Sequence, residues 1–264
     1  MVTFFEIGKL NKQILRQIIH STGKESAMDN IEVFKKWVTE SDNIVFFGGA
    51  GVSTESGIPD FRSVDGLYHQ EWAYPPETIL SHSFFERHPD EYYRFHRAKL
   101  VIENVQPNTA HKRLASLEAE GKLRAVITQN IDGLHQAAGS KNVLELHGSI
   151  LRAYCSRCGK PFPADVMNHG TGIPRCDCGG VIRPDIVLYE EPLDQDVMSS
   201  AIHYIRNAEV LIIGGTSLNV YPAAGLINYY RGDRLVLVNL SETPYDSYAN
   251  LIIHEKIGKV FSQI

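Results

Sequence analysis

The sequence predicts an α/β fold, in which a doubly wound parallel sheet is interrupted by a small cysteine-bearing insert. Short apolar runs with the pattern of buried strands alternate with segments of helical spacing, as in parallel sheets with right-handed crossovers. Several of these runs end in glycines or polar residues. All four cysteines lie between residues 155 and 178, apart from the alternating segments.

Composition and charge are those of an ordinary globular protein. The 264 residues are 43% hydrophobic and 22% charged, with a formal net charge of −5. This charge argues against broad nucleic-acid binding, which needs a basic surface. No apolar run approaches the roughly 20 residues of a membrane span, and no signal-peptide pattern is visible. We therefore expect a cytoplasmic protein with no membrane partner. Its oligomeric state stays open.

Residues 1–29 are predicted to form an N-terminal extension. Apolar residues from Leu10 to Ile19 recur with roughly helical spacing, which indicates a weak amphipathic helix. Met28 is an alternative start of the folded part, and residues 1–27 would then be dispensable. From residue 30 a second helical pattern leads into the first strand.

A glycine-rich turn over residues 48–51 follows the first predicted strand, residues 44–47. Glycines allow backbone N–H groups to close on an anion such as a nucleotide phosphate, and the hydroxyls of Ser53 and Thr54 would add donors. The third glycine of the standard dinucleotide fingerprint would fall at Thr54, so a plain glycine turn is the alternative for these residues taken alone.

The other elements are predicted from apolar periods and turn residues. A long loop over residues 64–82 has no regular period and is typical of a lid beside a cofactor site. A helical stretch begins at Ser83 with a break near Pro89, and another runs from Asn108 to Gly121. Further strands are predicted over residues 125–128, 143–146, 210–213, 235–238 and 251–253, with helices over 222–230 and 257–264.

Polar side chains follow two of these strands directly. Gln129, Asn130 and Asp132 come after one strand, and His147 comes after the next. Open parallel sheets bind ligands at the carboxyl ends of their strands, so we expect a ligand site there. Each residue also has an ordinary explanation: Asn130 and Asp132 suit an Asx turn, and a single histidine is more often structural than catalytic.

The insert contains two close cysteine pairs. Such pairs suit a tetrahedral zinc site with four thiolate ligands, although the second pair is shorter than the usual C-x-x-C. Four thiolates leave no open position for water, so the metal is expected to be structural and not catalytic. Reduced thiols or an occasional disulfide are the alternative. The predicted ligands are Cys155, Cys158, Cys176 and Cys178.

Several segments resemble motifs of the sirtuins, the NAD-dependent protein deacylases. The longest, Gly49–Arg62, is similar to G-A-G-I-S-x-x-S-G-I-P-D-F-R without a gap, with Val52 in place of isoleucine. Thr128–His135 resembles T-Q-N-I-D-x-L-H without a mismatch. The other resembling segments are residues 146–148, 183–187, 215–218 and 238–240.

The resemblance covers roughly residues 30–264 and implies a domain organisation. A Rossmann-like NAD-binding domain would comprise residues 30–149 and 186–264, and an inserted zinc-ribbon module would comprise residues 150–185. The implied activity is NAD-dependent lysine deacetylation (deacylation), in which the acyl group passes to ADP-ribose and nicotinamide is released. The implied partners are proteins or peptides with acylated lysine, bound as an added strand between the two parts, and one structural Zn²⁺.

The resemblance also implies roles for single residues. His147 would act as general base on a ribose hydroxyl, which a pKa near neutrality suits, and Asn130 is the second implied catalytic residue. The implied NAD contacts are Gly49, Ala50, Gly51, Thr54, Asp60, Phe61, Arg62, Gln129, Asn130, Ile131, Asp132, His147, Gly215, Thr216, Ser217, Asn239 and Ile257. The implied substrate contacts are Val187, Tyr189, Glu190, Leu218 and Val220.

Two departures from the family bear on the substrate. Glu190 stands where relatives usually have glycine, and its carboxylate near the groove would favour basic residues beside the target lysine. Relatives that remove succinyl or malonyl groups have Tyr-x-x-Arg in the helix near Tyr93, whereas His96 stands at the arginine position here. We therefore expect a neutral acyl group.

Two other functions stay open on the sequence alone. A mono-ADP-ribosyltransferase or NAD glycohydrolase would use the same pocket with another acceptor. A nucleotide-sensing module would bind without turnover, with the insert as a docking surface. The presence of His147 and of the peptide-groove segments favours deacylation.

Overall fold

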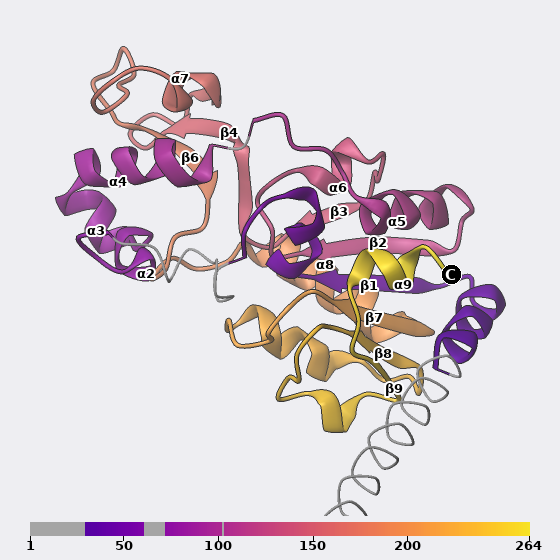
Figure 1. Cartoon of the computed structure of the whole chain (residues 1–264). Helices are drawn as coiled ribbons and strands as arrows, with labels where there is room; N and C mark the ends of the chain where they lie inside the picture. Colours follow the sequence, from indigo (N-terminus) through magenta and orange to yellow (C-terminus); the bar gives the residue numbers. More distant parts are fainter. Residues whose placement is uncertain (1–29, 61–71, 102) are drawn as a thin grey trace, which may run out of the picture.

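The computed structural model describes residues 30–60, 72–101 and 103–264. The predicted extension over residues 1–29 and part of the predicted lid therefore lie outside the described residues. The chain forms a six-stranded parallel sheet in the order β3-β2-β1-β7-β8-β9 (Figure 1). Its strands are β1 (Ile44–Gly48), β2 (Leu123–Thr128), β3 (Val143–Glu145), β7 (Val210–Gly214), β8 (Leu235–Val238) and β9 (Leu251–Ile253).

Helices cover both faces of this sheet, which explains why its strands are apolar on both sides. Ile44 and Phe46 of β1 pack into one hydrophobic cluster, with the helix over residues 30–40, α5 and α9. Val45 and Phe47 pack into the other, with α8 and η5. The bounds of these helices are α5 Thr109–Ala119, α8 Gln195–Asn207, η5 Ala223–Tyr229 and α9 Ile257–Phe261. The predicted doubly wound fold is confirmed.

A smaller module is built around an antiparallel sheet in the order β5-β4-β6. Helices lie beside this sheet (Figure 1), and the hydroxyl of Tyr93 donates a hydrogen bond to the carbonyl oxygen of Ile182 on β6. The elements are β4 (Gly148–Cys155), β5 (Pro161–Pro163), β6 (Ile182–Ile186), α2 (Pro76–Ile79), α3 (His82–Arg87), α4 (Pro89–Phe95), the π-helix η4 (His96–Leu100) and α7 (Asp165–Asn168).

The packing of this module differs from the predicted division of the chain. One hydrophobic cluster joins buried residues between Ile79 and Leu100 to buried residues between Ile150 and Leu188. The prediction placed residues 76–100 with the larger domain. Large aromatic side chains supply this shared core, because Tyr92, Tyr93 and Phe95 are fully buried. The packing does not test the predicted domain boundaries themselves, which stay a prediction.

Most predicted elements occur, but the predicted loop over residues 64–82 contains the helix α2 (Pro76–Ile79) and the first residue of α3. The helical stretch from residue 83 breaks at His88, before Pro89, and α5 has Asn108 as its N-cap, as expected. The predicted helix over residues 222–230 is the tighter 3₁₀ helix η5. The helix α8 was not predicted, although Asp194 caps it by accepting hydrogen bonds from two backbone N–H groups.

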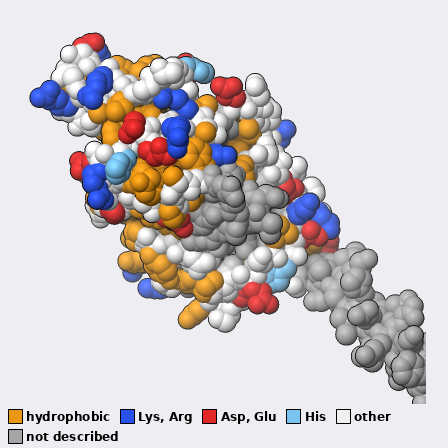
Figure 2. Space-filling model, turned by 60° about the vertical axis from the view of Figure 1, so that its left-hand side comes forward, with side chains coloured by type: hydrophobic (Ala, Val, Ile, Leu, Met, Phe, Trp, Pro, Cys, Tyr) orange, Lys and Arg blue, Asp and Glu red, His pale blue; other side chains and the backbone are white. Residues whose placement is uncertain are grey.

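On the face shown in Figure 2, Lys and Arg side chains are interspersed with Asp and Glu side chains. Within the described ranges, no helix is both long enough and apolar enough to cross a membrane.

Candidate active site

A cavity of about 820 Å³ opens at the carboxyl ends of the large sheet and is closed on one side by the small module. The residues that line it come from loops far apart in the sequence. Among the predicted site residues, the cavity brings together Gly49, Ala50, Gly51, Thr54, Asp60, Gln129, Asn130, Ile131, Asp132, His147, Val187, Tyr189, Glu190, Gly215, Thr216, Ser217, Val220, Asn239 and Ile257.

Two glycine loops touch at the base of this cavity. The N–H of Gly51 donates to the carbonyl oxygen of Gly215 at 2.8 Å. A Cβ at position 51 would lie 2.8 Å from that oxygen, and a Cβ at position 215 would lie 2.3 Å from the nitrogen of Val52. Gly215 also has a φ of +57°, which disfavours other residues. Only glycine therefore allows the β1 and β7 loops to meet so closely.

A chain of hydrogen bonds fixes the polar residues after β2. The Asn130 amide donates to the hydroxyl oxygen of Ser53 at 3.0 Å, and this hydroxyl donates to Asp132 at 2.6 Å. The other carboxylate oxygen of Asp132 accepts from the N–H of Leu134 at 2.9 Å, which is an Asx turn. Asp132 can therefore form an Asx turn and also belong to the ligand site. Both side-chain oxygens are held, so its carboxylate has one orientation.

The hydroxyl groups of the glycine-rich turn are used differently from the prediction. Ser53 and Thr54 were expected to add donors for an anion. Instead, the Ser53 hydroxyl donates to Asp132, and the Thr54 hydroxyl donates to the carbonyl oxygen of Gly51 at 3.0 Å. Ser53 is almost completely buried. It therefore works as a link between the first loop and the loop after β2.

His147 lies in the turn between β3 and β4 and lines the cavity. Its Nδ1 is 2.9 Å from the carbonyl oxygen of Gln129. A carbonyl oxygen only accepts, so Nδ1 carries the proton, and Nε2 of the neutral ring has the lone pair. Burial lowers the pKa of His147 below its ordinary value of 6.5, while the hydrogen bond to Gln129 partly offsets this effect. The neutral ring with a basic Nε2 is the form present at pH 7.

Two further histidines lie behind the site. The rings of His111 and His135 are 4.7 Å apart, and both residues are fully buried. Burial lowers the pKa of His111 to about 4 and that of His135 to about 3. Both rings are therefore neutral across the range in which enzymes are usually assayed.

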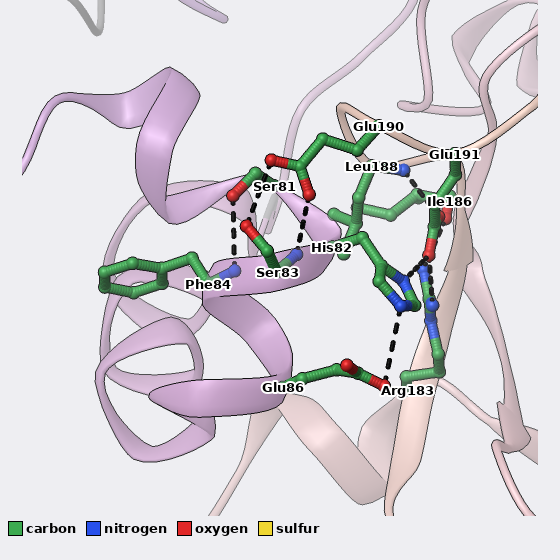
Figure 3. A network of polar contacts seen from close by, with 10 residues as sticks. All are labelled: Ser81, His82, Ser83, Phe84, Glu86, Arg183, Ile186, Leu188, Glu190 and Glu191. Carbon is green, nitrogen blue, oxygen red and sulfur yellow. Dashed lines mark hydrogen bonds and ion pairs between the residues drawn. The ribbon is translucent and has the colours of Figure 1, made fainter.

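The predicted substrate residues near β6 belong to a short segment, residues 187–191, which we call the groove segment. Figure 3 shows this segment against α3, with the carboxylates of Glu190 and Glu191 pointing to opposite sides. Arg183 forms two hydrogen bonds with Glu191, at 2.6 and 2.9 Å. Glu190 has a φ of +75°, a left-handed conformation that costs a non-glycine residue about 1 kcal/mol.

The four cysteines of the small module come together at the edge of its sheet. Their Sγ atoms all lie within 4.8 Å of one another. Thiolates bound tetrahedrally at about 2.3 Å from zinc would be about 3.8 Å apart. The separations of 3.4 Å between Cys155 and Cys178 and of 3.8 Å between Cys158 and Cys176 fit this geometry.

Some predicted residues lie elsewhere, and others were missed. Leu218 is 1% exposed and packs in the core beneath the cavity instead of lining it. Phe61 and Arg62 lie outside the described residues. The actual role of Ser53 was not predicted, because its partner Asp132 is remote in sequence. Lys99 and Tyr221 also line the cavity, and no sequence pattern indicated them.

Comparisons with known proteins agree with this geometry. Residues 49–222 match the sequence profile of the Sir2 family. The chain is 55% identical over 241 residues to an NAD-dependent protein deacetylase of Clostridium acetobutylicum, across 90% of this chain and 98% of that protein. It is similar to a solved structure described as "Sir2-p53 peptide-NAD+", with TM-score 0.80 and 42% identity, covering 88% and 96% of the two chains. Another, "Sir2 bound to acetylated peptide", has TM-score 0.80 and 40% identity, with the same coverage.

Proposed function

The chain belongs to the Sir2 family, and from this premise we propose that it is an NAD-dependent protein-lysine deacetylase. It transfers the acyl group from lysine to ADP-ribose and releases nicotinamide. The Clostridium acetobutylicum relative is named for this activity. The name of one solved structure includes NAD⁺, and that of the other includes an acetylated peptide. The single observation that carries the proposal is that His147, Asn130, Asp132 and the glycine loops line one cavity.

The residues of the cavity fit NAD. Its volume of about 820 Å³ is in the range of small-molecule sites. Ala50 and Thr54 begin two short 3₁₀ turns, and the first N–H groups of such turns have no partner within the turn. Ala50 and Thr54, with the glycine loops, would hold the pyrophosphate. Asp132, whose orientation is fixed by Ser53, would accept from the nicotinamide carboxamide.

The mechanism assigns the proton transfer to His147. NAD supplies the ribose carbon that bonds to the acyl oxygen when nicotinamide leaves. Nε2 of His147 would take the proton of a ribose hydroxyl, and the hydrogen bond from Nδ1 to Gln129 would stabilise the charged ring. The buried side chains of Ile150 and Leu188 line the same cavity and would exclude water from the reacting atoms.

The small module would hold one structural zinc ion. Its four cysteines offer four thiolates in tetrahedral separation, which fill the shell of Zn²⁺ and leave no position for water. Zinc would stabilise the turns after β4 and before β6. A cytoplasmic location is also proposed, and it is supported by four cysteines that cluster as metal ligands, as suits a reducing compartment.

Nicotinamide release with and without peptide tests the proposed function. The purified protein is incubated with NAD and an acetylated peptide, and nicotinamide and the mass of the peptide are followed. We expect nicotinamide release that needs the peptide, together with loss of the acetyl group. Release without peptide would support a glycohydrolase or an ADP-ribosyltransferase instead, and no release would support a binding module.

The rate should depend on the ionisation of His147. The base works only when neutral, so kcat/KM should fall as the pH is lowered through the pKa of His147. Burial places that pKa below 6.5, and activity should therefore be on its plateau at pH 7. The pH profile from 5 to 8.5 measures this, and His111 and His135 titrate too low to account for it. A half-maximal rate above pH 7 would contradict the assignment.

A neutral acyl group should be preferred over an acidic one. The arginines of the helix near Tyr93 are engaged elsewhere: Arg97 donates to the carbonyl oxygens of Met167 and Gly172. We expect kcat/KM for acetyl-lysine to exceed that for succinyl-lysine by at least tenfold. Lys99 lines the cavity, so Lys99→Ala is the matched variant. A preference of the wild type for succinyl-lysine would overturn the prediction. Loss of that preference in Lys99→Ala would show that the Lys99 side chain binds the acidic acyl group.

A further inference from the structure

The groove segment supplies acceptors to the beginning of α3. In a helix the first N–H groups have no intrahelical acceptor and must be capped. Two of the three caps here come from residues 187–191, so the segment and the helix are tied together (Figure 3). The three bonds run from His82 N to Tyr189 O at 3.0 Å, from Ser83 N to Glu190 Oε2 at 2.9 Å, and from Phe84 N to Ser81 Oγ at 3.3 Å.

Glu190 contributes more than a single cap. Its second oxygen, Oε1, accepts from the hydroxyl of Ser83 at 3.0 Å, so both carboxylate oxygens are used on one residue. A negative charge at the first turn of a helix is also favoured by the helix dipole. These contacts explain why the chain tolerates a left-handed backbone at Glu190.

The neighbouring Glu191 has a different, structural environment. Its carboxylate accepts from Arg183, from the N–H of Leu188 at 2.8 Å, and lies 2.8 Å from Nδ1 of His82. Arg183 is only 6% exposed, so removing Glu191 would leave a buried guanidinium without its carboxylate. Glu190, in contrast, is exposed. It can be replaced without leaving a buried charge unpaired.

We infer that Glu190 and Ser83 form a clamp that positions the wall of the peptide groove and thereby sets the affinity for the acylated peptide. This inference rests on the proposed function, because Tyr189 and Glu190 line the cavity where the peptide is proposed to lie. Glu190 is a positioning residue: it acts through the backbone of the groove segment. The chemistry at His147 does not depend on it.

Kinetics of three variants test the clamp. Glu190→Ala removes both oxygens and keeps the backbone cost of a non-glycine residue, Ser83→Ala removes the hydroxyl donor and keeps the N–H, and Glu190→Gln keeps one acceptor. We expect KM for the acetylated peptide to rise about tenfold in Glu190→Ala, the size of one charge-assisted hydrogen bond, and about threefold in the other two. The kcat and the KM for NAD should stay within twofold of the wild type. Glu77→Gln, on α2, also removes one negative charge from an exposed side chain and serves as the control. It should change none of these values.

Two peptides distinguish the clamp from direct electrostatic attraction between Glu190 and basic residues of the substrate. If the carboxylate of Glu190 attracts basic residues of the substrate, its loss should raise KM only for a peptide with lysines beside the acetyl-lysine. The clamp predicts the same rise for a peptide with alanines there. A rise confined to the basic peptide, an unchanged KM, or a fall confined to kcat would each overturn the inference.

Hydrogen exchange gives a readout that does not need turnover. The Ser83 amide should exchange faster in Glu190→Ala than in the wild type, while amides of α8 stay unchanged. If the wild type showed no peptide-dependent nicotinamide release, the proposed function would fail although the exchange result stood. If exchange at the Ser83 amide were unchanged in an active enzyme, the clamp would be disproved and the proposed function would stand.

Discussion

His147→Ala is expected to lower kcat for deacetylation by roughly 10²- to 10⁴-fold, the usual contribution of a general base. The reason is geometric: the carbonyl oxygen of Gln129 keeps the proton on Nδ1, so Nε2 is the basic atom at the cavity. Alanine offers no base at this position. Since His147 is not part of either glycine loop, the Kd for NAD should change less than threefold. Single-turnover rates and NAD titration by calorimetry measure the two effects.

Two matched variants make this result specific. His147→Gln fills the space and keeps a donor for Gln129, yet it has no basic nitrogen, so it should be as slow as His147→Ala. His203→Ala removes an exposed histidine from α8 and should leave the rate unchanged. If His147→Gln kept more than a tenth of the activity, the assignment of the base would be wrong.

Removal of one zinc ligand should have the largest effect on stability. Cys178 is exposed, so Cys178→Ala leaves no core cavity and changes little besides the thiolate. Structural zinc sites bind with apparent free energies on the order of 10 kcal/mol, as large as the stability of many whole domains. We expect Cys178→Ala to lose zinc, to unfold the turns around β5, and to lower the thermal midpoint by about 10 °C or more. Metal analysis and calorimetry measure these changes.

Ser156→Ala, between the first two cysteines, is the control and should keep one zinc per chain. Incubation of the wild type with a strong chelator should reproduce the Cys178→Ala profile, because the same thiolates are then left without metal. Protein prepared without chelator that contained no zinc would refute the site. So would a Cys178→Ala variant with normal zinc content.

Much of the fold followed from local patterns. The apolar runs of the large sheet are buried on both faces, and such runs are readable in the sequence. The four cysteines were readable because each pair is close in the chain. The helix α8 was not predicted, although Asp194, Val197, Ala201 and Ile205 have the spacing of a capped amphipathic helix.

Other features depend on contacts between distant residues, which one sequence does not reveal. The role of Ser53 is set by Asp132, and the left-handed backbone of Glu190 by Ser83 on α3. The burial of Leu218 depends on the layer of helices beneath the cavity. Site residues carried by continuous motifs could be named in advance. Their hydrogen-bond partners, and the packing of residues 76–100 on the small module, could not.

The small module also has a consequence for the order in which the protein is made. Its aromatic helices, around Tyr92 and Phe95, are synthesised long before the strand that ends at Ile186, with which they share a core. Until β6 has left the ribosome, this core lacks the part that β6 supplies, and its aromatic side chains are more exposed to chaperones and proteases. A nascent chain stopped before β6 should therefore aggregate, and the catalytic cleft should be among the last parts of the molecule to take shape.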